Sequence, residues 1–194
     1  MPNPTVTKPV LNSGPGFLYY APLATSLPAN TGIGSVFTDA WTSPWVWLGA
    51  STTGSVWHYN ITTSPQEVAE ILDPIAFPTT GRTATVNFNL ASYTASNLAI
   101  ALNGGTKTVT GSTTTTLTQV DPPTPGTETR FMLGWESLDA TIRKVAFQVI
   151  NSGDIAETFA KAPAFTDIPF TVSCEIPTSP AVPFRTWTAG VARG

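Results

Sequence analysis

Residues able to act as bases, nucleophiles or metal ligands are few in this chain. His58 is the only histidine and Cys174 the only cysteine, and they lie far apart in the sequence. A structural zinc site needs four Cys, His or carboxylate ligands, usually at close spacing, so these two residues do not indicate one. A serine hydrolase would need His58 as its base, but the chain has no G-x-S-x-G motif. We therefore interpret His58 as a packed or surface residue.

Pairs of carboxylates are the other candidates for chemistry, because two of them suffice for glycoside hydrolysis. Glu136 and Asp139 flank a predicted turn, and Glu67 and Glu70 lie on a predicted helix surface. Neither pair is set among aromatic residues that would keep one carboxyl group protonated. We interpret them as solvated charges. Cys174 falls on the apolar face of a predicted strand, which is typical of an inert buried thiol.

Charged residues make up only 11% of the 194 residues, and the net charge is −3. With 41% apolar residues, this excludes a disordered charged tail and a coiled coil. The chain also lacks the excess of basic residues with which proteins bind nucleic-acid phosphates. No phosphate-binding loop, transmembrane run or signal-peptide core is visible. We expect a chain made in the cytoplasm that is not an enzyme and holds no cofactor or metal.

The elements that would position these residues are mostly strands. Alternating apolar and polar residues predict strands within 17–20, 56–61, 82–90, 131–135, 145–149 and 168–176. In 82–90 the even-numbered apolar residues should face the core. In the next-to-last strand, Val145, Phe147 and Val149 should share one face.

Two short helices are also predicted. Ser64 to Glu67 has a capping residue, a proline at the first helical position and a glutamate at the capping-box position, so a helix should run from 65 to 72. A second helix is expected at 95–102, before Gly104 and Gly105. About seven to nine short strands with no βαβ rhythm predict a mainly β fold. We expect an antiparallel β-sandwich or barrel with one or two short flanking α-helices.

The segments around this domain are rich in proline and threonine. We expect an extended N-terminal arm at 1–16, a single β domain at 17–176 and an extended C-terminal arm at 177–194. Within the domain, 103–129 should form a long inner loop or hairpin. Ordering such segments costs entropy, so a chain usually keeps them because a partner orders them. This pattern favours a self-assembling structural subunit.

The tryptophans leave an alternative open. Trp45, Trp47 and Trp57 lie at loop and strand-end positions where sugar-stacking platforms occur. Core and interface packing is the favoured interpretation, because a large antiparallel sheet needs bulky side chains. A β-sandwich carbohydrate-binding or receptor-binding module remains the alternative function, and a small β-sandwich hydrolase is a weaker one.

Several characteristic sequence segments follow one another along most of the chain. They are GFLYYAPLATSLPAN at 16–30, AWTSPWVWLGASTTG at 40–54, TATVNFNLASYTASNLAIALNGG at 83–105, FMLGWESLDATIRKVAFQVINSGD at 131–154, and Ile168-Pro169-Phe170. Their order and spacing resemble the major tail proteins, or tail tube proteins, of long non-contractile-tailed bacteriophages, especially those that infect actinobacteria. The resemblance implies a fold of the phage tail tube type, with a β-sandwich or barrel flanked by a helix.

The resemblance also implies a function. Such virion subunits form rings, expected to be hexamers, that stack into a hollow phage tail tube. The partners are other copies of the chain, the tape-measure protein and the tail-terminator and tip proteins. Genomic DNA passes through the lumen without specific binding, and a net negative ring would not trap its phosphates. No membrane is involved. The residues expected to make assembly contacts are Trp45, Trp47, Thr113, Thr114, Thr115, Thr116, Asp121, Phe184 and Trp187.

Overall fold

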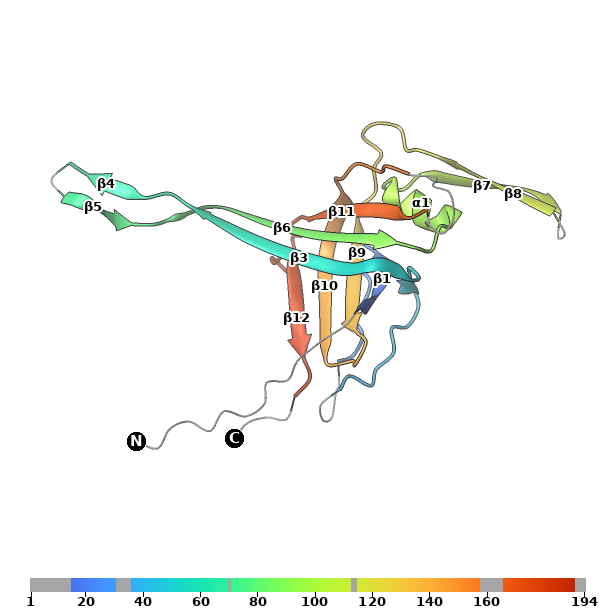
Figure 1. The fold of residues 1–194 in the computed structure, drawn as a ribbon, viewed down its shortest axis with the longest axis horizontal. Helices are drawn as coiled ribbons and strands as arrows, with labels where there is room; N and C mark the ends of the chain where they lie inside the picture. The colour runs from blue at the N-terminus through green and yellow to red at the C-terminus, as the bar shows by residue number, and fades with distance from the viewer. Residues whose placement is uncertain (1–14, 31–35, 70, 113–114, 158–165, 191–194) are drawn as a thin grey trace.

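The computed structural model describes residues 15–30, 36–69, 71–112, 115–157 and 166–190, and Figure 1 shows their arrangement. These residues form twelve strands and one helix. The strands are β1 (Gly16–Pro22), β2 (Val46–Trp47), β3 (Ser51–Thr63), β4 (Gln66–Val68), β5 (Ile71–Ala76), β6 (Thr79–Leu90), β7 (Thr106–Ser112), β8 (Thr115–Asp121), β9 (Phe131–Ser137), β10 (Ile142–Asn151), β11 (Ile168–Cys174) and β12 (Phe184–Thr188). The helix is α1 (Ala95–Ala101). The predicted mainly β class is confirmed.

The main sheet has the order β2-β1-β9-β10-β11-β6-β3, with β12 paired to β10, and its strand pairs are antiparallel. β10 meets β11 only at its C-terminal end, from Val149 to Asn151. β12 pairs with the other half of β10, from Ile142 to Ala146. The sheet therefore folds over at β10, so that β3, β6 and β11 cross the layer of β1, β9, β10 and β12 at a steep angle (Figure 1).

The core lies where these two layers face each other. As predicted for 82–90, Ala84, Val86, Phe88 and Leu90 of β6 are all buried. Phe88 stacks on Phe170 of β11 with ring centroids 4.7 Å apart. Burying a side chain of this size contributes about 1.5–3 kcal/mol to stability. The apolar residues that alternate along β6 thus form one side of the core.

The prediction that Val145, Phe147 and Val149 share one face is wrong. Val145 and Phe147 pack with Trp45 and Met132 in a second cluster on the outer side of β9 and β10. Val149 belongs to the main core between the layers. The pairing register of β10 with β9 shifts between positions 146 and 149. Such a bulge adds a residue to one strand and moves the following side chains to the opposite face.

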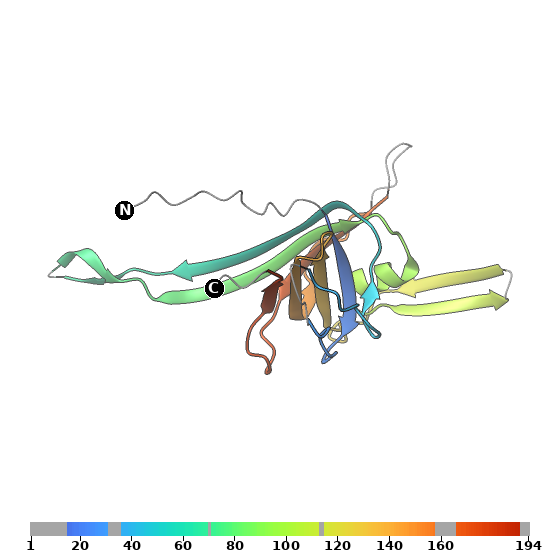
Figure 2. The ribbon, with the colours of Figure 1, turned by 90° about the horizontal axis from the view of Figure 1, so that it is seen from below.

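The helix predicted at 65–72 is also wrong, because this segment belongs to a long two-stranded ribbon. β3 and β6 pair from Ser51 to Thr63, and β4 and β5 continue their direction to the tip. We name 51–90 the long ribbon. Its far end lies away from the body of the molecule (Figures 1 and 2). A helix of two turns needs a surface to pack on, and this position offers none, so strand pairing prevails over the local capping pattern.

The second predicted helix is confirmed as α1. Thr94 caps it, since its side-chain oxygen accepts a hydrogen bond from the Asn97 backbone N–H at 3.1 Å. Ala101 is fully buried and Leu98 packs against the core. Gly104, with φ +98°, follows the end of the helix in the left-handed region that favours glycine.

The flanking segments differ partly from the expected arms. Residues 1–14 lie outside the described residues, and β1 begins at Gly16. The C-terminal segment 177–194 is not wholly an arm, because β12 inside it pairs with β10. The segment 103–129 contains the hairpin of β7 and β8, which pair from Thr106 to Ser112 and from Thr115 to Asp121. We name 106–121 the short ribbon.

Candidate assembly surfaces

The residues that could perform chemistry are dispersed. His58 is exposed on β3, and Glu67 is exposed on β4. Cys174 is half-buried, and burial raises the pKa of its thiol to about 11. A thiol with such a pKa is a poor nucleophile at neutral pH, because the reactive form is the thiolate. Within the described residues, no three His, Cys, Asp or Glu side chains gather in a group that could hold a metal ion.

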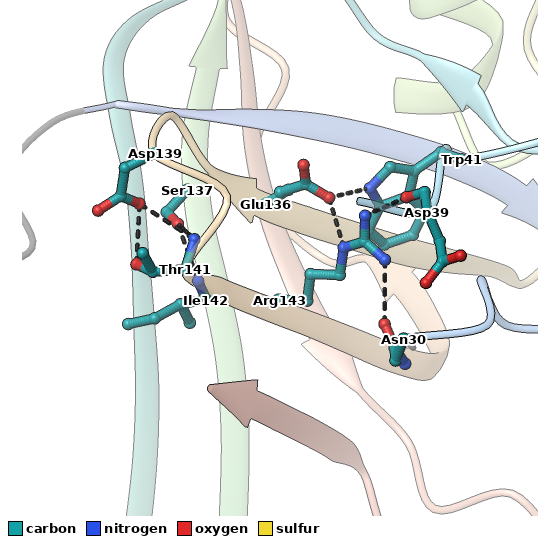
Figure 3. A network of polar contacts seen from close by, with 9 residues as sticks. All are labelled: Asn30, Asp39, Trp41, Glu136, Ser137, Asp139, Thr141, Ile142 and Arg143. Carbon is teal, nitrogen blue, oxygen red and sulfur yellow. Dashed lines mark hydrogen bonds and ion pairs between the residues drawn. The ribbon is translucent and has the colours of Figure 1, made fainter. Parts of the chain in front are cut away.

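Glu136 and Asp139 have separate structural roles, and Figure 3 shows both. Asp139 lies in the turn between β9 and β10 and accepts hydrogen bonds from the backbone N–H and the hydroxyl of Thr141. Hydrogen bonds from the side chains of Ser137 and Thr141 lower the pKa of Asp139. This carboxylate therefore shapes the turn.

Glu136 binds a buried cation. The guanidinium of Arg143 on β10 is 2% exposed, and its Nε donates to Oε2 of Glu136 at 2.5 Å (Figure 3). Nη1 donates to Oδ1 of Asn30 at 3.1 Å, and Nη2 donates to the backbone carbonyl of Asp39. The ring of Phe37 lies beneath the guanidinium, 4.8 Å from its carbon. Arg143 thus ties the segment 23–45 to the β9–β10 hairpin.

Two tryptophans, Trp41 and Trp45, pack on this side of the molecule. Nε1 of Trp41 also donates to Oε2 of Glu136, at 2.6 Å, and the Trp41 ring stacks on Tyr19. Burial, followed by the nearby Glu136 carboxylate, raises the pKa of Tyr19. Trp45 is 6% exposed and donates to the backbone carbonyl of Ser26 at 2.9 Å. Trp45 therefore has almost no surface to offer a partner in a single copy of the chain, and its role in assembly stays a prediction.

Gly134 on β9 gives room for this packing, and we predict that it tolerates no side chain. A Cβ atom there would lie 2.4 Å from the Trp41 ring and 3.0 Å from the Trp45 ring. Gly134→Ala should therefore destabilise the fold by about 1–3 kcal/mol, the usual cost of overpacking. Gly81→Ala on β6 is the matched control, because its nearest neighbour lies 3.9 Å away. Thermal unfolding of both variants measures the difference, and equal melting temperatures would contradict the prediction.

The three tryptophans proposed as a sugar platform do not share a surface. Trp45 lies in the outer cluster and Trp57 packs against the main core. Trp47 is 54% exposed on β2. It meets Phe17 edge to face, with an interplanar angle of 75°. With Leu138, which lines the same hollow, these two rings form an exposed apolar patch at the β1–β2 edge. Sequence reasoning singled out Trp47 but missed the patch, because only folding places Leu138 near it.

The long ribbon carries five of the sixteen large apolar side chains that are exposed in the described part of the chain. They are Val56, Tyr59 and Ile61 on β3, Ile75 on β5, and Phe77 between β5 and β6. Their exposed fractions range from 45% for Tyr59 to 62% for Phe77. Soluble proteins rarely leave such residues exposed along a whole element unless a partner covers them. The long ribbon is therefore a candidate contact surface that the sequence alone did not reveal.

The short ribbon is the second projection, and it extends from the opposite side of the body (Figures 1 and 2). Its predicted contact residues Thr116 and Asp121 are exposed on β8, and Thr115 begins that strand. Thr113 and Thr114 lie outside the described residues. Leu117, which sequence reasoning did not single out, is 69% exposed.

The remaining predicted contacts lie on β12. Phe184 packs edge to face on Trp57 and Tyr59 of β3, at 5.9 and 5.7 Å between ring centroids. Trp187 lies opposite Arg143 in the pairing of β12 with β10 and packs against the outer cluster. Both residues are partly buried, because they pack β12 against other strands of the same chain. The predicted contact residues that the structure describes are thus not brought together.

The outward face of β3, β6 and β11 is polar and uncharged. The register pairs Trp57 with Val86, and Val86 with Val172, in the core, so the neighbouring residues on each strand point the other way. The outward residues are Val56, His58, Asn60, Thr83, Thr85, Asn87, Asn89, Thr171 and Ser173. Hydroxyl and amide groups dominate this face, and His58 is the only ionisable residue among those just named. The Asp167 carboxylate lies at the border of the face, where it accepts a hydrogen bond from Nδ2 of Asn89 at 2.9 Å.

Comparisons with known proteins assign no family. No protein-family model matches the chain, and no curated protein matches it significantly. Among the described residues, no helix has the length and apolar character needed to cross a membrane.

Proposed function

We propose that this chain is a structural subunit of a self-assembled tube, as in the tail of a long non-contractile-tailed bacteriophage. The observation that carries the proposal is the pair of ribbons that leave the body in opposite directions with exposed apolar side chains (Figures 1 and 2). An isolated two-stranded ribbon is marginally stable in water, because it cannot bury a face by itself. Contact with other copies would cover both ribbons.

The direction of the ribbons indicates the kind of assembly. A ribbon on one side of a copy meets a different surface on the next copy, so the contact is head to tail. Contacts of this kind close into rings or continue as open filaments. In a tube of stacked rings, one set of contacts closes each ring and another set continues from ring to ring along the tube. Hexameric rings, the tape-measure partner and the virion location belong to this proposal through the family resemblance.

The edge of the main sheet supports the same function. β3 is the last strand in the sheet order and is 13 residues long. Long exposed edges pair readily with other strands, and soluble proteins usually protect them with charges or bulges. β3 carries no Asp, Glu, Lys or Arg from Ser51 to Thr63, and its two register shifts against β6 lie at the ends of the strand. Pairing between copies along β3 would close this edge.

The uncharged outward face of β3, β6 and β11 is the surface we assign to the lumen. A basic lining would hold a polyanion through counterion release. Hydroxyl and amide groups offer DNA only weak and exchangeable hydrogen bonds. The assignment explains how DNA would pass without specific binding.

A charge placed on this face tests the assignment. Thr83 is exposed on β6, and Thr83→Lys would add one cation per copy. Tubes of this variant should bind short duplex DNA at low salt and release it at high salt. Tubes of Thr83→Gln, which is similar in length and uncharged, should not bind. Co-sedimentation with labelled DNA measures the difference. Normal Thr83→Lys tubes without salt-dependent binding would contradict the assignment.

Negative-stain electron microscopy across a concentration series tests the function itself. Rings or hollow tubes that lengthen with concentration are the expected result. Small monodisperse particles at every concentration would contradict self-assembly by this chain alone. Titration of saccharides against tryptophan fluorescence then tests the carbohydrate-binding alternative, because exposed Trp47 would report a bound sugar.

A further inference from the structure

A hollow of about 230 Å³ lies between the middle of the long ribbon and the segment that leads into β12. Its wall is largely apolar, formed by Tyr59, Ala84, Cys174, Ile176, Val182 and Phe184. Ile176 is 63% exposed and Val182 is 38% exposed. Arg82 is the only charged side chain that lines this hollow. In the described part of the chain, no carboxylate forms an ion pair with Arg82. Among the described residues, the hollow is thus an apolar recess with the Arg82 cation, outside any ion pair, at its side.

The short ribbon has a face with matching properties. Leu117, Gln119 and Asp121 alternate along β8 and therefore point to one side of the ribbon. Their partners on β7 are threonines, so Leu117 is the only large apolar residue on this face. At 69%, Leu117 has the largest exposed fraction among the large apolar residues of the described chain. Asp121 is exposed, and its carboxylate accepts hydrogen bonds from its neighbour Gln119.

Within one copy the two features do not meet. The hollow is lined by residues of β3 and β6, of the end of β11 and of the segment before β12, whereas the short ribbon extends from the side of the body opposite to the far end of the long ribbon (Figure 1). A second copy placed head to tail would bring its short ribbon to this hollow. The charges are complementary, since the hollow offers a cation and the ribbon offers an anion.

We propose that the short ribbon of one copy docks in the hollow of the next, with Leu117 filling the recess and Asp121 facing Arg82. This contact rests on the proposed self-assembly and names the surfaces that make it. Arg82→Glu would place two carboxylates together and should raise the protein concentration needed for assembly by roughly tenfold. Adding Asp121→Arg to that variant should restore assembly, because the pair is again complementary.

Disulfide trapping tests the contact directly. Cys174→Ser removes the native thiol, and Leu117→Cys with Ile176→Cys then places one thiol on the ribbon and one at the hollow. Mild oxidation of assembled protein should give a ladder of covalent multimers on a non-reducing gel, since a disulfide forms only when the Cα atoms lie within about 7 Å. Val109→Cys in place of Leu117→Cys is the matched control, because Val109 lies on the opposite face of the ribbon.

The outcomes separate the contact from the function. A ladder with Leu117→Cys and none with Val109→Cys supports the docking. Tubes that give no ladder, or equal ladders from both variants, overturn the docking and leave the tube function standing. Wild-type protein that forms no multimers at any concentration overturns the proposed function and the docking together.

Discussion

Replacing Arg143 with alanine is expected to destabilise the folded chain by about 3–5 kcal/mol, which is the usual cost of removing one member of a buried ion pair. For a protein of this size, that corresponds to a loss of roughly 6–20 °C in melting temperature. Arg143 is 2% exposed, and Glu136 would remain largely enclosed without its cation. Thermal unfolding followed by circular dichroism measures the loss.

The effect should be large because one side chain joins several segments. The guanidinium contacts Asn30 and Asp39 as well as Glu136, and it lies over the Phe37 ring. Its loss would free the segment 23–45 from the β9–β10 hairpin. That segment supplies Trp45, which covers the outer cluster. We therefore expect increased exposure of tryptophan to a fluorescence quencher.

A second pair of variants separates the charge from the packing. Arg143→Met with Glu136→Leu removes both charges and keeps comparable volume, so it should recover much of the stability lost in Arg143→Ala. Arg130→Ala is the control, because its ion pair with Glu175 is more than 30% exposed on both sides. Such a pair contributes about 0–1 kcal/mol. An equal loss in Arg130→Ala and Arg143→Ala would contradict the proposed role of burial.

Removal of the short ribbon is expected to abolish tubes and leave the domain folded. Lys107 and Val120 are directly opposite in the pairing of β7 with β8. Residues 108–119 can therefore be replaced with Asn-Gly, which forms a two-residue hairpin turn. The contact of the ribbon base with α1 would remain, because Lys107, whose Nζ donates to Oγ of Ser96 at 3.2 Å, is retained.

The expected result has two readouts. Circular dichroism and the melting temperature should stay close to those of the full chain, because the replaced part of the ribbon contributes nothing to the two buried clusters. Electron microscopy should show no tubes at concentrations where the full chain forms them. Thr116→Ser is the control and should form normal tubes. Tubes of normal length from the shortened chain would exclude the short ribbon from assembly.

Some of the candidate site was readable from local sequence. The Thr-rich segment 103–129 was predicted to contain a hairpin, and β7 and β8 form it. This hairpin is a candidate contact surface because it projects from the body of the molecule. The apolar face of the long ribbon was not foreseen. Tyr59 and Ile61 follow the alternation of a half-buried strand, and only the folded chain shows that these side chains are 45% and 49% exposed.

The sequence by itself determined the elements whose signals are local. Alternation in 82–90 predicted the buried face of β6, and the Gly104-Gly105 signal predicted where α1 ends. Tertiary structure decided the rest. It made 64–76 a ribbon tip, moved Val149 to the other face by a bulge, and enclosed Arg143. These outcomes depend on partners distant in sequence, and the free energy of such pairing and burial exceeds the small preferences of a few neighbouring residues.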